Sequence, residues 1–260
     1  MFEIQYILLG IIQGLTEFLP ISSSGHLVLF SQLTNWGDQG IFTDISVHFG
    51  TLFAVLIYLR KDIYYFLANI FQFQIFEDQI IFKIILSTMP AIFVGYFIYD
   101  YVSVYFRNIQ LIAISSMVFA IILFFADKMK IENKGWKQIT YREAFIIGSF
   151  QVLAFIPGAS RAGVTITGAR FLGYSRLNAA RFSMILSIPI ILASMTLSLI
   201  NVYKEDYVEI NFYQSLSASL VAFITAIISI IFLMKFIKKS NFNIFIIYRI
   251  LLGISLLLFA

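Results

Sequence analysis

The sequence predicts an all-α polytopic membrane protein with six transmembrane helices and two re-entrant helix hairpins in an inverted repeat. Three observations lead to this prediction. Of the 260 residues, 60% are apolar and only 12% are charged, whereas a soluble domain is about 45–50% apolar and about 25% charged. Apolar stretches of bilayer-spanning length recur along the chain, and two further apolar segments are interrupted by polar turns that contain a proline.

The composition also excludes several classes of protein. A chain this apolar is neither disordered nor collagen-like. We expect no nucleic-acid partner, because the net charge of +4 has meaning only through where the basic residues lie. The absence of cysteine excludes a disulfide framework, a thiolate nucleophile and a cysteine metal site. No linker or low-complexity tract divides the sequence, so we expect a single integral membrane domain over 1–260.

Six stretches are long and apolar enough to cross a bilayer, which takes about 20 residues. We place these spans near 42–59, 80–100, 109–126, 178–200, 212–234 and 243–260. The aromatic-rich segment 62–76 is short for a span and has charged residues at both ends, so we expect a helix at the membrane interface. We expect no removable signal peptide, because the first residues include no basic region.

The basic residues predict the orientation of the spans, since cytoplasmic loops are enriched in Lys and Arg. The loop 127–142 holds five of them and is expected to be cytoplasmic, as are the turns after the first and fifth spans. The loops 101–108 and 201–211 hold few. The residues that mark the cytoplasmic side are Arg60, Lys61, Lys128, Lys130, Lys134, Lys137, Arg142, Lys235, Lys238 and Lys239.

Two segments, 3–35 and 143–176, do not fit as simple spans. Each consists of two apolar pieces joined by a polar turn, at Pro20 in the first segment and at Pro157 in the second. A broken polar backbone at membrane depth is stable only where it is buried in protein or lines a wet cavity. We therefore interpret both segments as re-entrant hairpins, and charge alternation requires the first to enter from outside and the second from inside.

The two hairpin segments resemble each other in sequence. The pair Gly10 and Gln13 recurs as Gly148 and Gln151, and Phe18-Leu19-Pro20-x-x-Ser23 recurs as Phe155-Ile156-Pro157-x-x-Ser160. Each segment is followed by three expected spans, so we predict inverted halves at about 1–126 and 143–260, with the broken helices meeting near the midplane. The alternative is eight plain helices whose proline turns are similar by chance.

The polar side chains of the two hairpin segments form the candidate site, because ionisable groups within apolar segments are costly and are usually functional. Gln13 and Glu17 lie four residues apart and share a helix face. The serines after each proline suit helix N-caps, and Arg161 and Thr165 follow the second cap. The candidate residues are Gln13, Glu17, Ser22, Ser23, Ser24, Gly25, His26, Gly158, Ser160, Arg161 and Thr165.

These residue types indicate phosphate chemistry. Two helix N-termini offer amides and positive dipole ends to an anion, and Arg161 adds a planar fork that matches phosphate oxygens. A serine or a histidine can attack phosphorus, and Glu17 can hold a divalent cation or act as a base. Each residue also has a purely structural explanation, as a cap, a packing residue or a buried ion pair. Their convergence on two matched turns favours phosphoryl hydrolysis.

Two further polar residues, His48 and Gln151, are candidates for lining the cavity. For His48 a structural role and a functional role are equally open. Arg176 and Arg181 are expected to mark the cytoplasmic interface instead. Ser183 is expected to form interhelical contacts.

At these positions the sequence resembles the undecaprenyl-diphosphate phosphatases, the bacitracin-resistance membrane proteins of bacteria. The resemblance covers essentially the whole chain and depends on two long motifs. It is strongest over Gly14-Leu15-Thr16-Glu17-Phe18-Leu19-Pro20-Ile21-Ser22-Ser23-Ser24-Gly25-His26 and Pro157-Gly158-Ala159-Ser160-Arg161-Ala162-Gly163-Val164-Thr165, and extends to His48-Phe49-Gly50-Thr51 and Tyr248-Arg249.

The resemblance implies a multi-pass hydrolase of the bacterial inner (plasma) membrane with its active site toward the outer side. Such an enzyme removes one phosphate from the C55 carrier lipid diphosphate, which recycles the carrier for peptidoglycan synthesis and confers bacitracin resistance. It also implies a divalent cation, Mg²⁺ or Ca²⁺, at Glu17 and Gln13. Ser23 and His26 would then belong to the catalytic centre, and Ser160, Arg161 and Thr165 to the phosphate-binding set. To that set we add Ser22, Ser24, Gly25 and Gly158 as further phosphate-binding candidates, because they lie in the two turns.

Two departures from the family pattern affect the site. Gln13 replaces the first acid of an acidic pair, so a two-carboxylate cation site is incomplete here. Ala162 replaces a serine, which removes one hydroxyl near the phosphate. We expect Ser23 to be the nucleophile, assisted by His26, with His26 itself as the second choice. The rival hypothesis is a polyprenyl-phosphate transporter, since inverted repeats with broken helices are typical of transporters. A homodimer is left open.

Overall fold

The computed structural model describes residues 4–34, 40–71, 79–105, 108–132, 135–204 and 211–259. These residues form helices and no strand, which confirms the all-α prediction. The α-helices are α1 (Ile4–Thr16), α2 (Ser23–Leu33), α3 (Ile41–Tyr58), α4 (Arg60–Phe71), α6 (Ile80–Tyr105), α7 (Ile109–Asp127), α8 (Tyr141–Val152), α9 (Arg161–Phe171), α10 (Arg176–Lys204), α11 (Phe212–Lys239) and α12 (Asn243–Phe259), with short 3₁₀ helices at η1 (Trp136–Gln138) and η2 (Leu153–Phe155).

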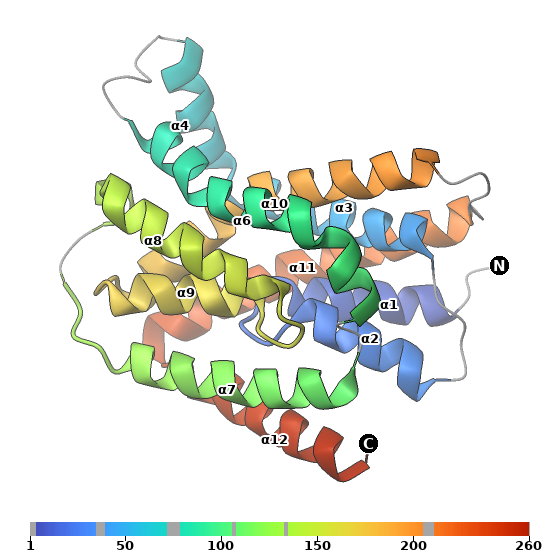
Figure 1. Ribbon diagram of the computed structural model, residues 1–260. Helices are drawn as coiled ribbons and strands as arrows, with labels where there is room; N and C mark the ends of the chain where they lie inside the picture. The colour runs from blue at the N-terminus through green and yellow to red at the C-terminus, as the bar shows by residue number, and fades with distance from the viewer. Residues whose placement is uncertain are drawn as a thin grey trace.

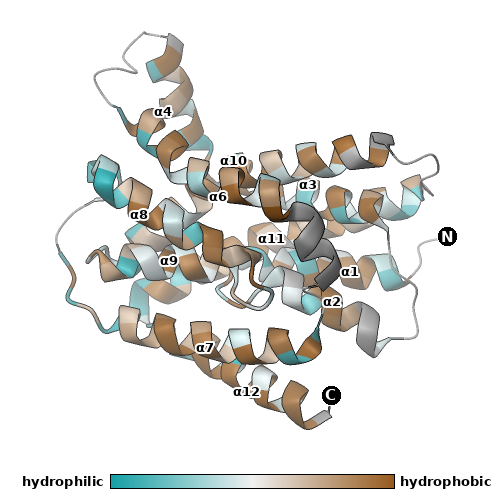
Figure 2. Ribbon diagram, viewed as in Figure 1, coloured by the Kyte–Doolittle hydropathy of each residue, from teal (hydrophilic) through white to brown (hydrophobic). Residues whose placement is uncertain are grey.

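Within the described residues, five helices are long and apolar enough to cross a membrane, namely α3, α6, α7, α10 and α11. They coincide with five of the six predicted spans. The sixth, α12, has 17 residues and is therefore about 25 Å long, somewhat less than the hydrocarbon core of about 30 Å. Figure 2 shows the apolar character of the outer helices, with α7 and α12 brown over most of their length.

The described residues of the segments 3–35 and 143–176 form two helix hairpins, α1–α2 and α8–α9. Their helices have 11–13 residues and are about 17–20 Å long, so each covers roughly half a bilayer. In Figure 1 the hairpins start from opposite ends of the bundle, and their turns meet in the middle. This arrangement brings residues 17–23 beside residues 157–161.

Small residues allow the hairpins to pack tightly on the long helices. A Cβ on Gly10 or Gly14 of α1 would overlap backbone carbonyls of α11, and a Cβ on Gly148 of α8 would overlap the carbonyl oxygen of Ser87 on α6. The hydroxyl of Ser87 also donates to the carbonyl of Ala144, over 2.8 Å. Close approach at small residues is the usual way in which helices associate in membranes.

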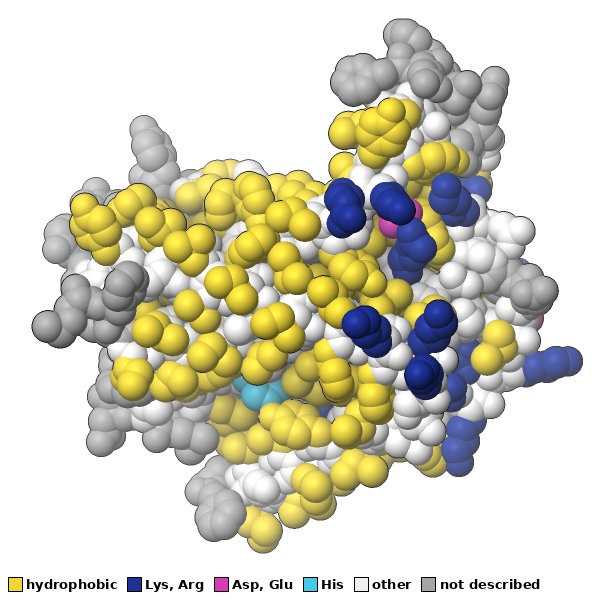
Figure 3. All heavy atoms as spheres, turned by 180° about the vertical axis from the view of Figure 1, so that it is seen from behind, with side chains coloured by type: hydrophobic (Ala, Val, Ile, Leu, Met, Phe, Trp, Pro, Cys, Tyr) yellow, Lys and Arg dark blue, Asp and Glu magenta, His cyan; other side chains and the backbone are white. Residues whose placement is uncertain are grey.

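Lys and Arg side chains gather at one end of the molecule, while the rest of the face seen in Figure 3 is largely apolar. Among the described residues, three ion pairs join elements at this end: Arg176–Asp127 and Arg181–Asp62, each with an N–O distance of 2.7 Å, and Arg170–Asp127 at 3.5 Å. Helix α4 projects from the same end (Figure 1) and begins at Arg60. It covers most of the helix predicted over 62–76, of which 72–76 lie outside the described residues.

The substitution Gly148→Ala tests the close packing of α8 on α6. The added methyl group must displace backbone rather than a flexible side chain, and overpacking of this kind costs about 1–3 kcal/mol. We expect a lower midpoint of thermal unfolding in detergent. Gly135→Ala is the matched control, because its Cβ would meet only the Gln138 side chain at 3.8 Å. Equal midpoints for the two variants would contradict the packing.

Candidate active site

The two polar turns have the same local geometry. Ser22 and Ser160 are the N-caps of α2 and α9, and both adopt a left-handed backbone, with φ of 76° and 70°. The hydroxyl of Ser22 accepts from the amide of Gly25 over 3.4 Å, and that of Ser160 accepts from the amide of Gly163 over 3.1 Å. Non-glycine residues in this conformation are strained and often lie at functional sites. Both serines therefore act as caps in the structure.

A buried arginine holds the two turns together. Arg249 on α12 is fully buried, and its guanidinium donates to the carbonyls of Gly158 over 2.8 Å, Ala159 over 3.0 Å and Pro20 over 3.4 Å. The hydroxyl of Ser115 on α7 donates to the carbonyl of Pro157. Because irregular backbone at membrane depth needs internal partners, these bonds satisfy carbonyls that the broken helices leave free.

Two predicted phosphate-binding glycines lie where the turns touch. A Cβ on Gly25 would be 3.7 Å from the Cα of Gly158, and Gly158 has a positive φ of 88°. A Cβ on Gly158 would overlap Ser115 and the carbonyl of Ile112 on a backbone that favours glycine, whereas a Cβ on Gly25 would meet Gly158 at an ordinary contact distance. The structure explains Gly158 by packing, and the contact of both glycines with phosphate stays a prediction.

The centre of the site is a carboxylate that connects the hairpins. Glu17 Oε1 is 2.6 Å from Nη2 of Arg161, so α9 supplies the positive charge that pairs with the acid after α1. Glu17 Oε2 accepts from the hydroxyl of Ser23 over 2.8 Å and from the amide of Gln13 over 3.0 Å. The side chains of Glu17 and Arg161 are only 6% and 12% exposed. Four of the predicted residues thus form one hydrogen-bonded cluster.

Neighbouring groups fix the orientation of Arg161. Its Nη1 donates to the carbonyl of Ser183 over 3.3 Å, and its guanidinium carbon lies 5.7 Å from the ring centre of Phe18. Thr165, which is fully buried, shares a 2.7 Å hydrogen bond with the hydroxyl of Ser183. Thr165 therefore supports the helix pair that carries Arg161, and Ser183 makes the interhelical contact expected from the sequence.

The ring nitrogens of His26 bind partners outside the Glu17 cluster. Its Nδ1 donates to the carbonyl of Ser22 over 2.6 Å, and its Nε2 is 2.6 Å from the hydroxyl of Tyr248 on α12. The sequence suggested that His26 assists Ser23, but in the structure the hydroxyl of Ser23 bonds to Glu17 and both ring nitrogens are engaged elsewhere. The carboxylate of Glu17 is thus the base nearest to Ser23.

The other candidate residues lie around this centre. The ring of His48 on α3 donates through Nδ1 to the carbonyl of Asp44 over 2.8 Å. Gln151 is 1% exposed, and both of its amide atoms lack a partner among the described residues. The side chain of Ser24 lies outside the described part of the structure.

The side chains of Gln13 and Glu17 can bind a divalent cation, but they supply only some of the ligands that it needs. Among the described residues, no group of three or more His, Asp and Glu side chains gathers. However, Oε1 of Gln13 is buried without a partner beside the Glu17 carboxylate. An amide oxygen and a carboxylate are suitable ligands for Mg²⁺ or Ca²⁺. Gln13 and Glu17 therefore fit the cation only if phosphate oxygens or water complete its coordination.

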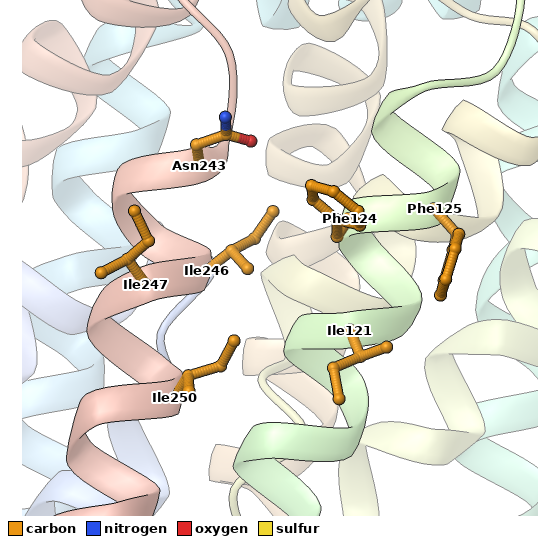
Figure 4. Close-up of a pocket in the computed structure, with 7 residues that line it drawn as sticks. All are labelled: Ile121, Phe124, Phe125, Asn243, Ile246, Ile247 and Ile250. Atoms are coloured by element: carbon orange, nitrogen blue, oxygen red, sulfur yellow. The ribbon is translucent and has the colours of Figure 1, made fainter.

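Two apolar hollows open on the helix surface. One, of about 470 Å³, runs from α1 and α11 to His26 and Tyr248, and its walls are Ile12, Leu15, Thr16, Leu19, Ile21, Ile228, Ser229 and Phe232. The other lies between α7 and α12 and is lined by apolar side chains and Asn243 (Figure 4), with no ionisable group. Only the first hollow reaches the candidate site.

Sequence reasoning gave no role to Arg249 or Tyr248. The sequence did indicate a role for Arg249, because it is a charged residue inside the apolar stretch 243–260, where charged residues are costly and usually functional. Tyr248 gave no such signal, since tyrosine is common at membrane interfaces. Its contact with His26 depends on the packing of α12 against the first turn.

The substitution Arg249→Gln tests the connection between the turns. It leaves three backbone carbonyls without a charged donor, and each unsatisfied buried group costs about 1–3 kcal/mol. We expect a marked fall in the midpoint of thermal unfolding in detergent. Lys238→Gln, at the exposed end of α11, removes the same charge as a control and should change little. A midpoint for Arg249→Gln close to that of the control would show that the arginine does not hold the turns.

Comparisons with known proteins agree with the geometry. The sequence model of the family described as "Bacitracin resistance protein BacA" matches residues 6–255. A protein named undecaprenyl-diphosphatase, from Aliivibrio salmonicida (strain LFI1238), is 42% identical over 256 residues, which cover 96% of this chain and 95% of that protein. The chain belongs to the bacitracin resistance protein BacA family.

Proposed function

We propose that this membrane protein hydrolyses undecaprenyl diphosphate to undecaprenyl phosphate and inorganic phosphate. The observation that carries the proposal is the cluster of Glu17, Ser23 and Arg161, where a nucleophile, a base and a phosphate-binding cation come together from two hairpins. The name of the 42% identical relative supports the same reaction. Removal of the terminal phosphate would return the carrier lipid to peptidoglycan synthesis and counteract bacitracin.

The diphosphate would bind by competing with Glu17 for the guanidinium of Arg161. Without substrate, the guanidinium pairs with a single carboxylate, Glu17, at 2.6 Å. A diphosphate carries more negative charge and offers oxygens in the geometry that the arginine fork matches. The N-termini of α2 and α9 add amides and dipole ends. When Arg161 turns to the phosphate, Glu17 loses a charge partner and becomes a stronger base.

Ser23 is then placed to act as the nucleophile. Its hydroxyl already donates to Glu17 over 2.8 Å, so the carboxylate can take the proton as the oxygen attacks the terminal phosphorus. A bond forms between Ser23 Oγ and phosphorus, and the bond from phosphorus to the bridging oxygen breaks. The bridging oxygen takes the proton from Glu17 as the lipid monophosphate leaves, which restores the carboxylate. Water then attacks the phosphoserine and gives one proton to the departing serine oxygen, which frees inorganic phosphate.

The apolar hollow beside α1 and α11 suits the isoprenoid chain of the substrate. Its volume is about 470 Å³, and most of its lining is apolar. It reaches His26, three residues after Ser23. A chain in this hollow would leave its head group at the polar turns and its remaining length in the lipid.

The membrane placement that we propose has six spans, with α12 as the sixth, and two re-entrant hairpins. The half-bilayer length of the hairpin helices and their matched serine caps support an inverted repeat with halves at about 1–126 and 143–260. The clustering of Lys and Arg at one end supports a cytoplasmic position for that end. The first hairpin, with Glu17 and Ser23, then enters from the outer side of the bacterial inner membrane, and we propose that substrate arrives there.

A divalent cation, Mg²⁺ or Ca²⁺, would be held by Glu17 and by the unpartnered Oε1 of Gln13. When bound, it would neutralise part of the diphosphate charge. With or without the cation, the residues that bind and orient the substrate are Glu17, Ser23 and Arg161. Because Gln13 is neutral, we propose that the phosphate itself supplies part of the coordination.

Purified protein with Mg²⁺ should release phosphate from undecaprenyl diphosphate. We expect Glu17→Gln, Ser23→Ala and Arg161→Lys each to lower kcat at least about 100-fold, because each removes a group that acts on developing charge or on the attacking oxygen. Ser255→Ala, at an exposed position of α12, should retain full turnover.

Near wild-type turnover in both the Glu17 and the Arg161 variant would show that the site is elsewhere. In a liposome assay, movement of the carrier lipid between leaflets without phosphate release would favour the transport hypothesis instead.

The variant Gln13→Glu tests the cation site. A second carboxylate next to Glu17 should bind a divalent cation more tightly and repel Glu17 when no cation is present. We expect EDTA to abolish turnover and the Mg²⁺ concentration for half-maximal activity to fall severalfold in this variant. Gln110→Glu, at the exposed start of α7, controls for the added charge. The same Mg²⁺ dependence in both variants would remove Gln13 from the cation site.

A further inference from the structure

We propose that Tyr248 is a positioning residue for His26, and that its hydroxyl fixes the orientation of the imidazole by donating to Nε2. The proposal rests on the function proposed above and adds to its steps His26, which lies three residues after Ser23 and lines the hollow assigned to the substrate chain. It is carried by two contacts between residues 222 positions apart, a hydrogen bond of 2.6 Å and a ring stack.

The imidazole is held on both edges. On one edge Nδ1 donates to the carbonyl of Ser22 over 2.6 Å, and on the other Nε2 meets the hydroxyl of Tyr248 over 2.6 Å. The two rings are also nearly parallel, with an interplanar angle of 8° and centres 5.7 Å apart. A single hydrogen bond would leave the ring free to tilt about it, whereas two bonds on opposite edges fix its plane.

The same contacts determine which nitrogen carries the proton. A backbone carbonyl only accepts, so Nδ1 must be protonated. In the neutral ring Nε2 is therefore the acceptor, and the hydroxyl of Tyr248 is its donor. A second partner that sets the tautomer of a histidine in this way is a common device at functional sites.

Tyr248 is itself held in a rigid place. The next residue, Arg249, is fully buried and bonds to carbonyls of both turns, including Pro20, two residues before Ser22. The backbone of Tyr248 is thus fixed to the turn that presents His26. Both side chains also line the hollow of about 470 Å³ assigned to the isoprenoid chain, so the pair lies between the chain and the polar turn.

The test compares Tyr248→Phe with wild-type protein, using undecaprenyl diphosphate and Mg²⁺. The variant keeps the ring and loses only the hydroxyl. We expect kcat to fall about tenfold, the effect of one hydrogen bond of typical strength, while KM stays within about twofold. Tyr213→Phe is the matched control, because Tyr213 on α11 is 81% exposed and should keep wild-type values. A change in KM alone would assign Tyr248 to chain binding and overturn the proposal.

A second measurement does not depend on turnover. In ¹⁵N-histidine-labelled protein without substrate, we expect His26 to show a protonated Nδ1 and an unprotonated Nε2, with the His26→Gln variant used to assign its signals. In Tyr248→Phe the Nε2 signal should shift, as it loses its donor. An unchanged Nε2 signal together with unchanged kcat would overturn the proposal. If wild-type protein releases no phosphate, the proposed function fails, and the Nε2 signal alone decides whether Tyr248 positions the ring.

Discussion

The ion pair between Glu17 and Arg161 is the interaction on which the rest of the site depends. It joins two residues 144 positions apart, one from each hairpin, at 2.6 Å and with little exposure. Removal of one partner of a buried pair typically costs about 3–5 kcal/mol, because a charge is left uncompensated. The pair therefore ties the two hairpins to each other as well as placing a base and a phosphate-binding group side by side. A ligand that carries more negative charge than a carboxylate can displace Glu17 and bind Arg161 in its place.

The architecture around the pair follows from the cost of helices that end inside the protein. Each such end leaves amides or carbonyls without helical partners, and when buried these groups need other partners within the protein. The carbonyls are satisfied by Arg249 and Ser115, and one amide in each helix by the caps Ser22 and Ser160. Such capping leaves the first amides of α2 and α9 without helical partners, and these are the groups that an anion can use. The break between the two helices of each hairpin thus creates both the buried groups that need partners inside the protein and the free amides that an anion can bind.

Much of the fold could be predicted from the sequence, since apolar length and proline position are local signals. They located α3, α6, α7, α10 and α11 and both hairpins, and the paired turns indicated Glu17, Ser23 and Arg161. The contacts of His26 could not be predicted, because they depend on how α12 packs against the first turn. For the same reason Tyr248 was missed and His26 was expected to assist Ser23.

A double-mutant cycle of phosphate release tests the central claim, that the two hairpins build one site through Glu17 and Arg161. The rate constants of wild-type protein, Glu17→Gln, Arg161→Gln and the double variant would be measured on undecaprenyl diphosphate at saturating Mg²⁺. Residues that act as one unit give strongly non-additive losses. The account predicts that the double variant is no slower than about the slower single variant. Losses that multiply, as for two independent positions, would contradict it.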